Sequence, residues 1–79
     1  MDKQLTFGEK LVGIGFNPSA DPKVQRAKEI CAELANMIHE HMHETLTESS
    51  DLKCVIYQHA LGEILNAQMN AVKLLTFKP

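Results

Sequence analysis

The chain is predicted to be an all-α protein in which a short N-terminal helix precedes a long antiparallel helical hairpin. Two observations favour this class. Apolar residues recur at helical spacing over most of residues 22–77, whereas three of the four glycines and two of the three prolines lie before residue 24. With 79 residues the chain forms a single domain, with a head segment at residues 1–20 and the hairpin at residues 21–79.

The head segment is expected to contain one short helix. Thr6 and Glu9 have the spacing of a capping box, in which each side chain accepts a hydrogen bond from the other residue's backbone. The helix should therefore begin at Phe7, and the glycines in residues 13–15 should end it.

The first long helix is predicted over about residues 22–46. Asp21 is a good N-cap, and Pro22 suits the first helical position because its missing N–H would have no partner there. A three-four spacing of apolar residues then defines one face: Val24, Ala27, Cys31, Leu34 and Ile38.

The second long helix is predicted from Leu52 to about Phe77. The polar run T-E-S-S-D, around Ser49 and Ser50, breaks the helical pattern and offers caps. Facing residues of the two helices should then sum to about 97, and the hairpin should be about 37 Å long. This register places Cys31 about 19 Å from Cys54, too far for a disulfide.

The net charge of −2 conceals a polarised distribution. Residues 1–28 carry +2, residues 29–52 carry −6 and residues 53–79 carry +2. In the expected hairpin, one end is therefore cationic and the turn end anionic. The cations expected at the first end are Lys23, Arg26, Lys28, Lys73 and Lys78. A nucleic acid polymer is not an expected partner, because no continuous basic stripe accompanies the negative net charge.

The sequence predicts a soluble cytoplasmic protein that self-associates. No apolar run is long enough to span a bilayer and no export signal opens the chain, so no membrane partner is expected. A domain of this size buries little apolar surface by itself, so further copies are the expected source of core.

No enzyme, cofactor or metal is expected. G-x-S-x-G, H-E-x-x-H and Walker A motifs are missing from the sequence. His39 and His43 share a helical face, and His59 faces His39 in the expected register, so a three-histidine zinc site is geometrically possible. The tight Cys/His spacing of zinc motifs is missing, however, and solvated surface histidines are the commoner outcome.

A small nucleotide fits the head segment better than a polymer does. One ring, two ammonium groups and one amide gather there: Phe7, Lys10, Lys23 and Asn17. An aromatic ring suits stacking on a base, and ammonium groups suit phosphate. The alternative is structural, with Phe7 and Phe16 as core residues and the lysines solvated.

Two stretches carry a family resemblance: residues 5–24, L-T-F-G-E-K-L-V-G-I-G-F-N-P-S-A-D-P-K-V, and residues 67–78, A-Q-M-N-A-V-K-L-L-T-F-K. They resemble a family of small phage and prophage proteins built on the hairpin domain of anti-CBASS and anti-Thoeris nucleotide sponges. The resemblance covers almost the whole chain.

The resemblance implies a phage protein of host defence evasion. In the cytoplasm of the infected bacterial host it would bind and sequester cyclic oligonucleotide second messengers of CBASS-type defence, such as cyclic GMP-AMP, without cleaving them. It also implies interlocked antiparallel dimers that assemble into a homo-hexamer. Cyclic dinucleotides would bind between protomers, and some members of the family have separate pockets for cyclic trinucleotides.

The resemblance also implies which residues bind the ligand. By motif position, Phe7 matches the base-stacking aromatic residue, Asn17 matches a polar ligand contact, and Lys10 could reach a phosphate. The family's C-terminal aromatic residue, often Trp, is Phe77 in this sequence, and that difference argues against stacking on the ligand at the end of the chain. The implied ligand-binding set is Phe7, Lys10, Asn17, Pro18, Ser19, Lys23 and Arg26.

Other functions compete with this one. The protein could be a sponge for the cyclic ADP-ribose isomers of Thoeris defence, which relatives capture in a comparable pocket. It could also be a helical protein-interaction module whose apolar stripe binds a host or phage protein. A cyclic nucleotide hydrolase is disfavoured, because the sequence offers no metal or nucleophile set.

Overall fold

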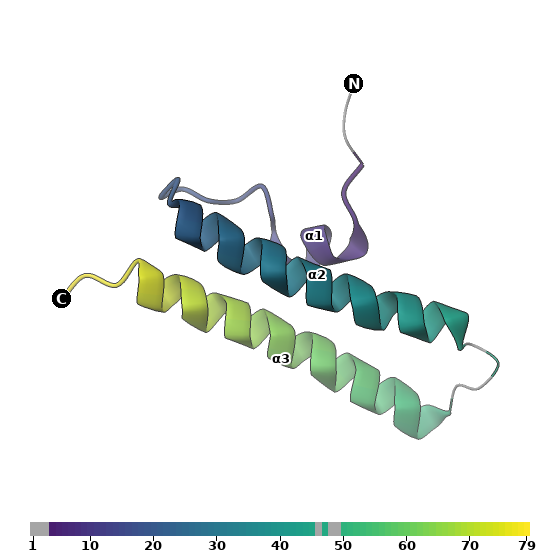
Figure 1. Ribbon diagram of the computed structural model, residues 1–79. Helices are drawn as coiled ribbons and strands as arrows, with labels where there is room; N and C mark the ends of the chain where they lie inside the picture. Colours follow the sequence, from purple (N-terminus) through teal and green to yellow (C-terminus); the bar gives the residue numbers. More distant parts are fainter. Residues whose placement is uncertain (1–3, 46, 48–49) are drawn as a thin grey trace.

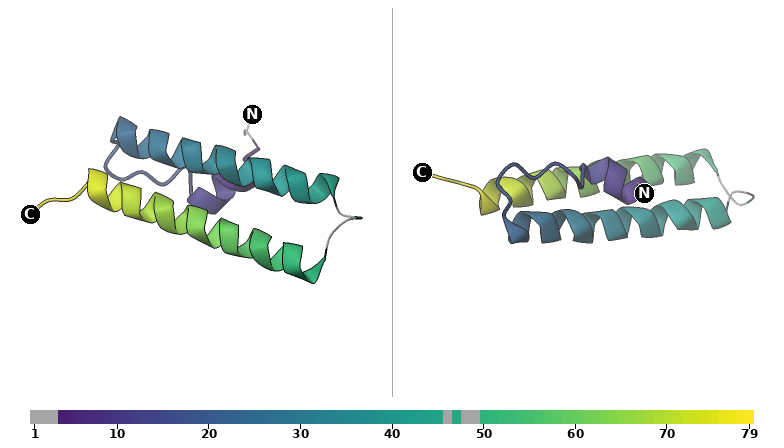
Figure 2. Two further views of the ribbon diagram at one scale, coloured as in Figure 1. Left: turned by 60° about the horizontal axis from the view of Figure 1, so that its bottom comes forward. Right: turned by 90° about the horizontal axis from the view of Figure 1, so that it is seen from above.

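The computed structural model describes residues 4–45, 47 and 50–79, which form three helices and no strand. These are α1 (Phe7–Val12), α2 (Pro22–Glu44) and α3 (Asp51–Leu75). The predicted all-α class is therefore confirmed for the described part of the chain. Figures 1 and 2 show α2 and α3 side by side and running in opposite directions, with α1 on one face of the pair.

The capping box predicted for α1 is present. The Thr6 hydroxyl accepts a hydrogen bond from the Glu9 backbone N–H at 3.2 Å, and the Glu9 carboxylate accepts one from the Thr6 N–H at 2.9 Å. Gly13 ends the helix with a φ of 64°, a left-handed conformation that glycine adopts without a Cβ clash. Both predicted ends of α1 are therefore confirmed.

The predicted start of α2 is confirmed, and the helix ends at Glu44, two residues before the approximate end expected near residue 46. Asp21 caps the helix by accepting a hydrogen bond from the Lys23 N–H at 2.8 Å. The helix ends at Glu44, because Thr45 leaves the helical conformation and donates its hydroxyl to the His41 carbonyl at 2.8 Å. Side-chain bonds of this kind compete with continued helix. Residue 46 lies outside the described residues.

Helix α3 begins at Asp51 and ends at Leu75, two residues before the predicted end at Phe77. Ser50 supplies the N-cap, since its hydroxyl accepts a hydrogen bond from the Lys53 N–H at 3.1 Å. Thr76 ends the helix as Thr45 ends α2, donating its hydroxyl to the carbonyl four residues earlier. Ser49, which belongs to the predicted turn, lies outside the described residues.

Side-chain contacts fix how α2 and α3 are aligned. The His39 Nδ1 lies 2.9 Å from the Tyr57 hydroxyl, and the Lys53 ammonium donates to the Thr45 hydroxyl at 2.6 Å. Both pairs agree with facing residues that sum to about 97. The start of α2 and the end of α3 therefore lie at the same end of the molecule, which we call the head end.

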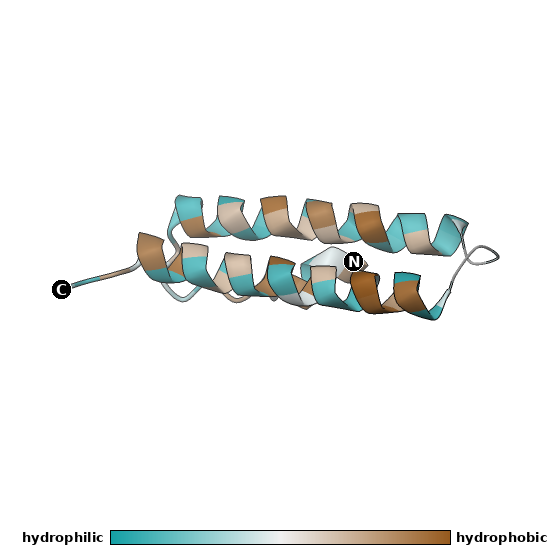
Figure 3. Cartoon of the chain, turned by 90° about the horizontal axis from the view of Figure 1, so that it is seen from below, coloured by the Kyte–Doolittle hydropathy of each residue, from teal (hydrophilic) through white to brown (hydrophobic). Residues whose placement is uncertain are grey.

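The core of the single chain is small. The buried apolar residues of the described chain are Val12, Val24, Ala32, Ala35 and Ile64. The molecule is flat, with extents of 47 × 37 × 12 Å, so much of each long helix lacks a second layer. Figure 3 shows apolar residues, in brown, recurring along both long helices. Many of them are large and exposed, including Ile30, Leu34, Met37, Leu52, Val55 and Ile56.

Two further sequence expectations concern the membrane and the thiols. Of the helices in the described ranges, none is long and apolar enough to cross a bilayer. Cys31 and Cys54 are free thiols, and burial raises the pKa of the Cys31 thiol above its usual value.

Candidate functional site at the head end

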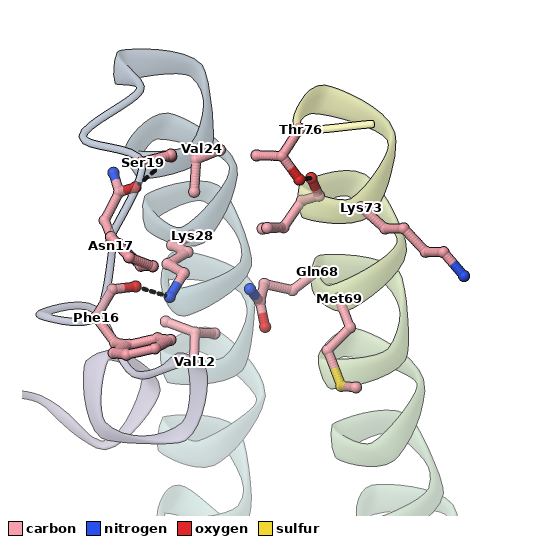
Figure 4. Close-up of a pocket in the computed structure, with 12 residues that line it drawn as sticks. Val12, Phe16, Asn17, Ser19, Val24, Lys28, Gln68, Met69, Lys73 and Thr76 are labelled. Carbon is pink, nitrogen blue, oxygen red and sulfur yellow. Dashed lines mark hydrogen bonds between the residues drawn. The ribbon is translucent and has the colours of Figure 1, made fainter. Parts of the chain in front are cut away.

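A cavity of about 570 Å³ lies at the head end, where the loop after α1 meets α2 and α3 (Figure 4). This volume is within the usual range of small-molecule sites, about 300–1,000 Å³. Its apolar walls come from all three helices and include Val12, Val24, Met69 and Val72. The cavity is therefore formed jointly by segments that are far apart in sequence.

The polar groups of this cavity are cationic or neutral. Among the residues that line it are two lysines, Lys28 and Lys73, and no aspartate or glutamate. Figure 4 shows the Lys73 side chain extending away from the cavity, whereas Lys28 lies within it. The local field therefore favours an anionic occupant over a cationic one.

Lys28 is the central group of the site. The sequence placed it among the cations of the head end, where it lies, but its side chain is buried, with 5% exposed. Its ammonium donates to the Gly13 carbonyl at 3.0 Å and to the Phe16 carbonyl, and it lies 5.5 Å from the centre of the Phe16 ring. In the described part of the chain, no carboxylate is within ion-pair distance of it. Lys28 is covered because the loop after α1 folds over this position.

The loop that carries the F-N-P-S motif is held by its own side chains. The Asn17 amide donates to the Asp21 carbonyl at 3.1 Å and accepts from the Ser19 hydroxyl at 2.9 Å. The Ser19 oxygen in turn accepts a hydrogen bond from the Asp21 N–H at 3.3 Å. Asn17 thus has both ends of its amide engaged within the loop.

Three of the seven residues implied as ligand contacts lie at this cavity: Asn17, Pro18 and Ser19. The other four do not line it within one protomer. Phe7 instead stacks face to face on the His39 ring, with ring centres 4.0 Å apart. His39 lies about 16 Å from Lys28 along α2, so Phe7 contacts a different part of that helix.

Lys10, Lys23 and Arg26 are exposed. Arg26 lies on the outer side of α2, where its guanidinium is 3.4 Å from the Glu29 carboxylate and 3.6 Å from that of Glu33. These are solvent-exposed ion pairs, which typically contribute little to stability. The structure therefore does not bring Arg26 together with Asn17 in one protomer.

The histidines weighed as zinc ligands serve other contacts. His39 packs between Phe7 and His43 and contacts the Tyr57 hydroxyl, whose pKa is raised by burial. His59 lies 4.0 Å from the Glu63 carboxylate on the exposed side of α3. No group of three His, Cys, Asp or Glu side chains in the described residues could hold a metal ion.

Sequence reasoning missed three residues of the cavity: Phe16, Lys28 and Gln68. Phe16 was considered only as a core residue, and that alternative is wrong because its side chain is 72% exposed. Gln68 is 5% exposed although it is polar, and no hydrogen bond joins its side-chain amide to any described residue. The sequence did contain a signal for Gln68, because it is a polar residue on the inner face of α3. No local sequence pattern indicated that the Lys28 side chain would be covered.

Comparison with protein-family models, with curated proteins and with solved structures gives no match to this chain.

Proposed function

We propose that this protein binds and sequesters a small anionic nucleotide at the head end, with a cyclic dinucleotide such as cyclic GMP-AMP as the ligand. The observation that carries the proposal is the buried Lys28 ammonium in a cavity whose described lining has no carboxylate. A buried charge without a counter-ion is costly, and a phosphate oxygen would supply one. An ammonium has three donors, and two of those of Lys28 are used by carbonyls.

The Phe16 ring supports a nucleotide rather than inorganic phosphate. It lines the cavity, and its 72% exposure leaves a face available for a base. Stacking on an exposed ring contributes about 1–3 kcal/mol per base. The apolar walls formed by Val24 and Val72 suit the sugar and base better than they suit a free ion.

The biological setting of the proposal comes from the family resemblance of residues 5–24 and 67–78. On that basis the protein is a phage sponge that captures the second messengers of CBASS-type defence in the host cytoplasm. A sponge needs affinity and abundance but no barrier-lowering groups, so no catalytic set is required of it.

The same proposal includes a helical hairpin assembled into interlocked dimers and a hexamer. The small core of one chain and its exposed stripe of Ile30, Leu34 and Met37 support association. In an isologous dimer each binding residue is present twice around a two-fold axis, which matches the approximate symmetry of a cyclic dinucleotide. Phe7 and Lys10 would then reach the ligand from a neighbouring copy.

Calorimetry with cyclic GMP-AMP tests the proposal. The wild-type protein should bind it at micromolar concentration or tighter, and chromatography of ligand recovered after heat denaturation should return it intact. Phe16→Ala should weaken binding about tenfold to a hundredfold, through the loss of one stacking contact. Circular dichroism should show the variant as folded as the wild type, since the ring is mostly exposed.

Phe77→Ala is the matched control, because Phe77 is similarly exposed at 67% and does not line the described cavity. It should bind as the wild type does. An absence of heat, recovery of cleaved ligand, or equal losses in the Phe16 and Phe77 variants would contradict the proposed site.

The exposed apolar stripe on α2 also favours a second candidate, a protein-interaction module. In that case the head motif is structural, so cyclic nucleotides should not bind and Phe7→Ala should cost stability or assembly. A sponge should instead keep its assembly and lose ligand in the same variant. Including cyclic ADP-ribose isomers in the calorimetry distinguishes a Thoeris sponge from a CBASS sponge.

A further inference from the structure

Gln68 is a buried amide with no hydrogen-bond partner in the described chain. It projects from the C-terminal half of α3 into the head-end cavity, opposite Lys28 (Figure 4), and is 5% exposed. A side-chain amide has two N–H donors and one oxygen acceptor. Polar groups that are mostly buried in folded proteins are usually hydrogen-bonded, so an amide at the cavity wall without a partner in the described chain indicates a site for a polar group of an occupant.

The amide is not sealed inside the protein. No fully enclosed side-chain oxygen or nitrogen of the described residues lacks a hydrogen bond, so the unpaired amide atoms of Gln68 must reach the open space of the cavity. The other amide that lines the cavity, Asn17, is engaged at both ends within its loop. Gln68 is thus the amide that can offer a donor and an acceptor together to an occupant.

We infer that Gln68 is a specificity-determining residue that reads a base edge of the ligand and favours adenine. This inference rests on the proposed nucleotide-binding function. An amide pairs bidentately with a neighbouring donor and acceptor, as glutamine does with adenine N6 and N7. Adenine presents such a pair, N6 and N7, on its Hoogsteen edge, where guanine presents only acceptors, O6 and N7. Guanine does offer a donor and an acceptor, N1–H and O6, on its Watson–Crick edge, so the preference for adenine arises because Gln68 reads the Hoogsteen edge.

The position of Gln68 allows it to contact a base while Lys28 binds a phosphate of the same ligand. Lys28 faces it from α2 with its ammonium, and the Phe16 ring lies beside that ammonium. A ligand with its phosphate toward Lys28 and one base among the apolar walls would bring the base edge to α3. The walls beside Gln68, including Met69 and Val72, offer no competing hydrogen bond from their side chains.

The test compares cyclic di-AMP with cyclic di-GMP by calorimetry. The wild-type protein should bind cyclic di-AMP about tenfold more tightly or better. Gln68→Met, which keeps the length of the side chain, should abolish this preference by weakening cyclic di-AMP binding. Gln58→Met is the matched control because Gln58 is exposed on the same helix, and it should leave the preference unchanged.

A second readout separates ligand recognition from a structural role. Without ligand, Gln68→Met should have an equal or higher melting temperature than the wild type, because the Gln68 amide makes no hydrogen bond within the described chain that the substitution could remove, and the cavity walls beside it are apolar. If that variant does not fold, Gln68→Leu takes its place in both measurements. An unchanged preference in the variants overturns the inference and leaves the sponge proposal standing, whereas absence of binding of any cyclic nucleotide to the wild type overturns both.

Discussion

At the scale of single residues, Gly8 sets how closely α1 approaches α2. A Cβ built on Gly8 would lie 2.1 Å from the Ala32 carbonyl oxygen, which is part of the α2 backbone and cannot move aside as a side chain could. Ala32, the α2 residue that Gly8 approaches, is itself small and buried. Small residues on both sides therefore allow the two backbones to touch.

Gly8→Ala is expected to destabilise the protein by about 1–3 kcal/mol, because α1 must move away from α2 to admit the new methyl group. Urea unfolding followed by circular dichroism measures the change. Gly62→Ala is the control, since Gly62 lies in α3 with nothing within 4 Å of its added Cβ, and it should gain about 0.5–1 kcal/mol from helix propensity. Equal effects of the two substitutions would show that α1 does not pack on α2 in this way.

At the scale of helices, α1 depends on a side chain of α2. A helix of six residues is too short to be stable by itself. The Asn36 amide oxygen accepts a hydrogen bond from the Gly8 N–H at 2.6 Å, and its NH₂ donates to the Thr6 hydroxyl at 3.0 Å. Asn36 therefore satisfies one of the free N–H groups at the start of α1 and holds the N-cap in place.

Asn36→Ala is expected to cost about 1–2 kcal/mol, because the Gly8 N–H loses its partner in a partly buried site. Hydrogen exchange should show the loss of protection concentrated in α1. Asn66→Ala provides the comparison, since Asn66 is exposed on α3 and should change stability by only a few tenths of a kcal/mol. Unchanged exchange in α1 of the Asn36 variant would contradict this account of its docking.

At the scale of the whole molecule, the exposed apolar surface is the dominant feature. In the described part of the chain, five apolar residues are buried in the core, whereas twelve large apolar side chains are exposed. Ile30, Leu34 and Met37 recur at helical spacing, so they form one stripe on α2. Such a stripe is a normal place for another copy to pack.

The wild-type protein should therefore sediment as a dimer-based oligomer at micromolar concentration. Replacing Ile30 and Leu34 together by Glu should shift it to monomer, because two charges would have to be buried at the contact. Replacing Gln58 and Asn66 by Glu adds the same charge at exposed polar positions of α3 and should leave the oligomer intact. A monomeric wild-type protein would remove the assembly from the proposal.

The two threonines that end the long helices illustrate what local patterns could not predict. Apolar spacing predicted helix ends near residues 46 and 77, and each helix ends two residues earlier, at Glu44 and Leu75. Thr45 and Thr76 each donate a hydroxyl to the carbonyl four residues earlier. A hydroxyl can do this within a continuing helix or at its end, so the sequence does not distinguish the two outcomes.

The candidate cavity shares only its loop with the ligand contacts that the family resemblance implies. Asn17, Pro18 and Ser19 form a local turn motif, and they line the cavity. The sequence did not indicate that the loop after α1 leaves the Phe16 ring exposed and covers the Lys28 side chain. Those outcomes depend on how segments distant in sequence pack together.

The sequence alone determined the helical class, the capping residues and the approximate register of α2 and α3, because these follow from interactions within a few residues and from a regular helical rise. Only the tertiary structure decided that Lys28 and Gln68 face each other across one cavity. Their burial arises where the loop, α2 and α3 meet, and no local periodicity encodes such a meeting.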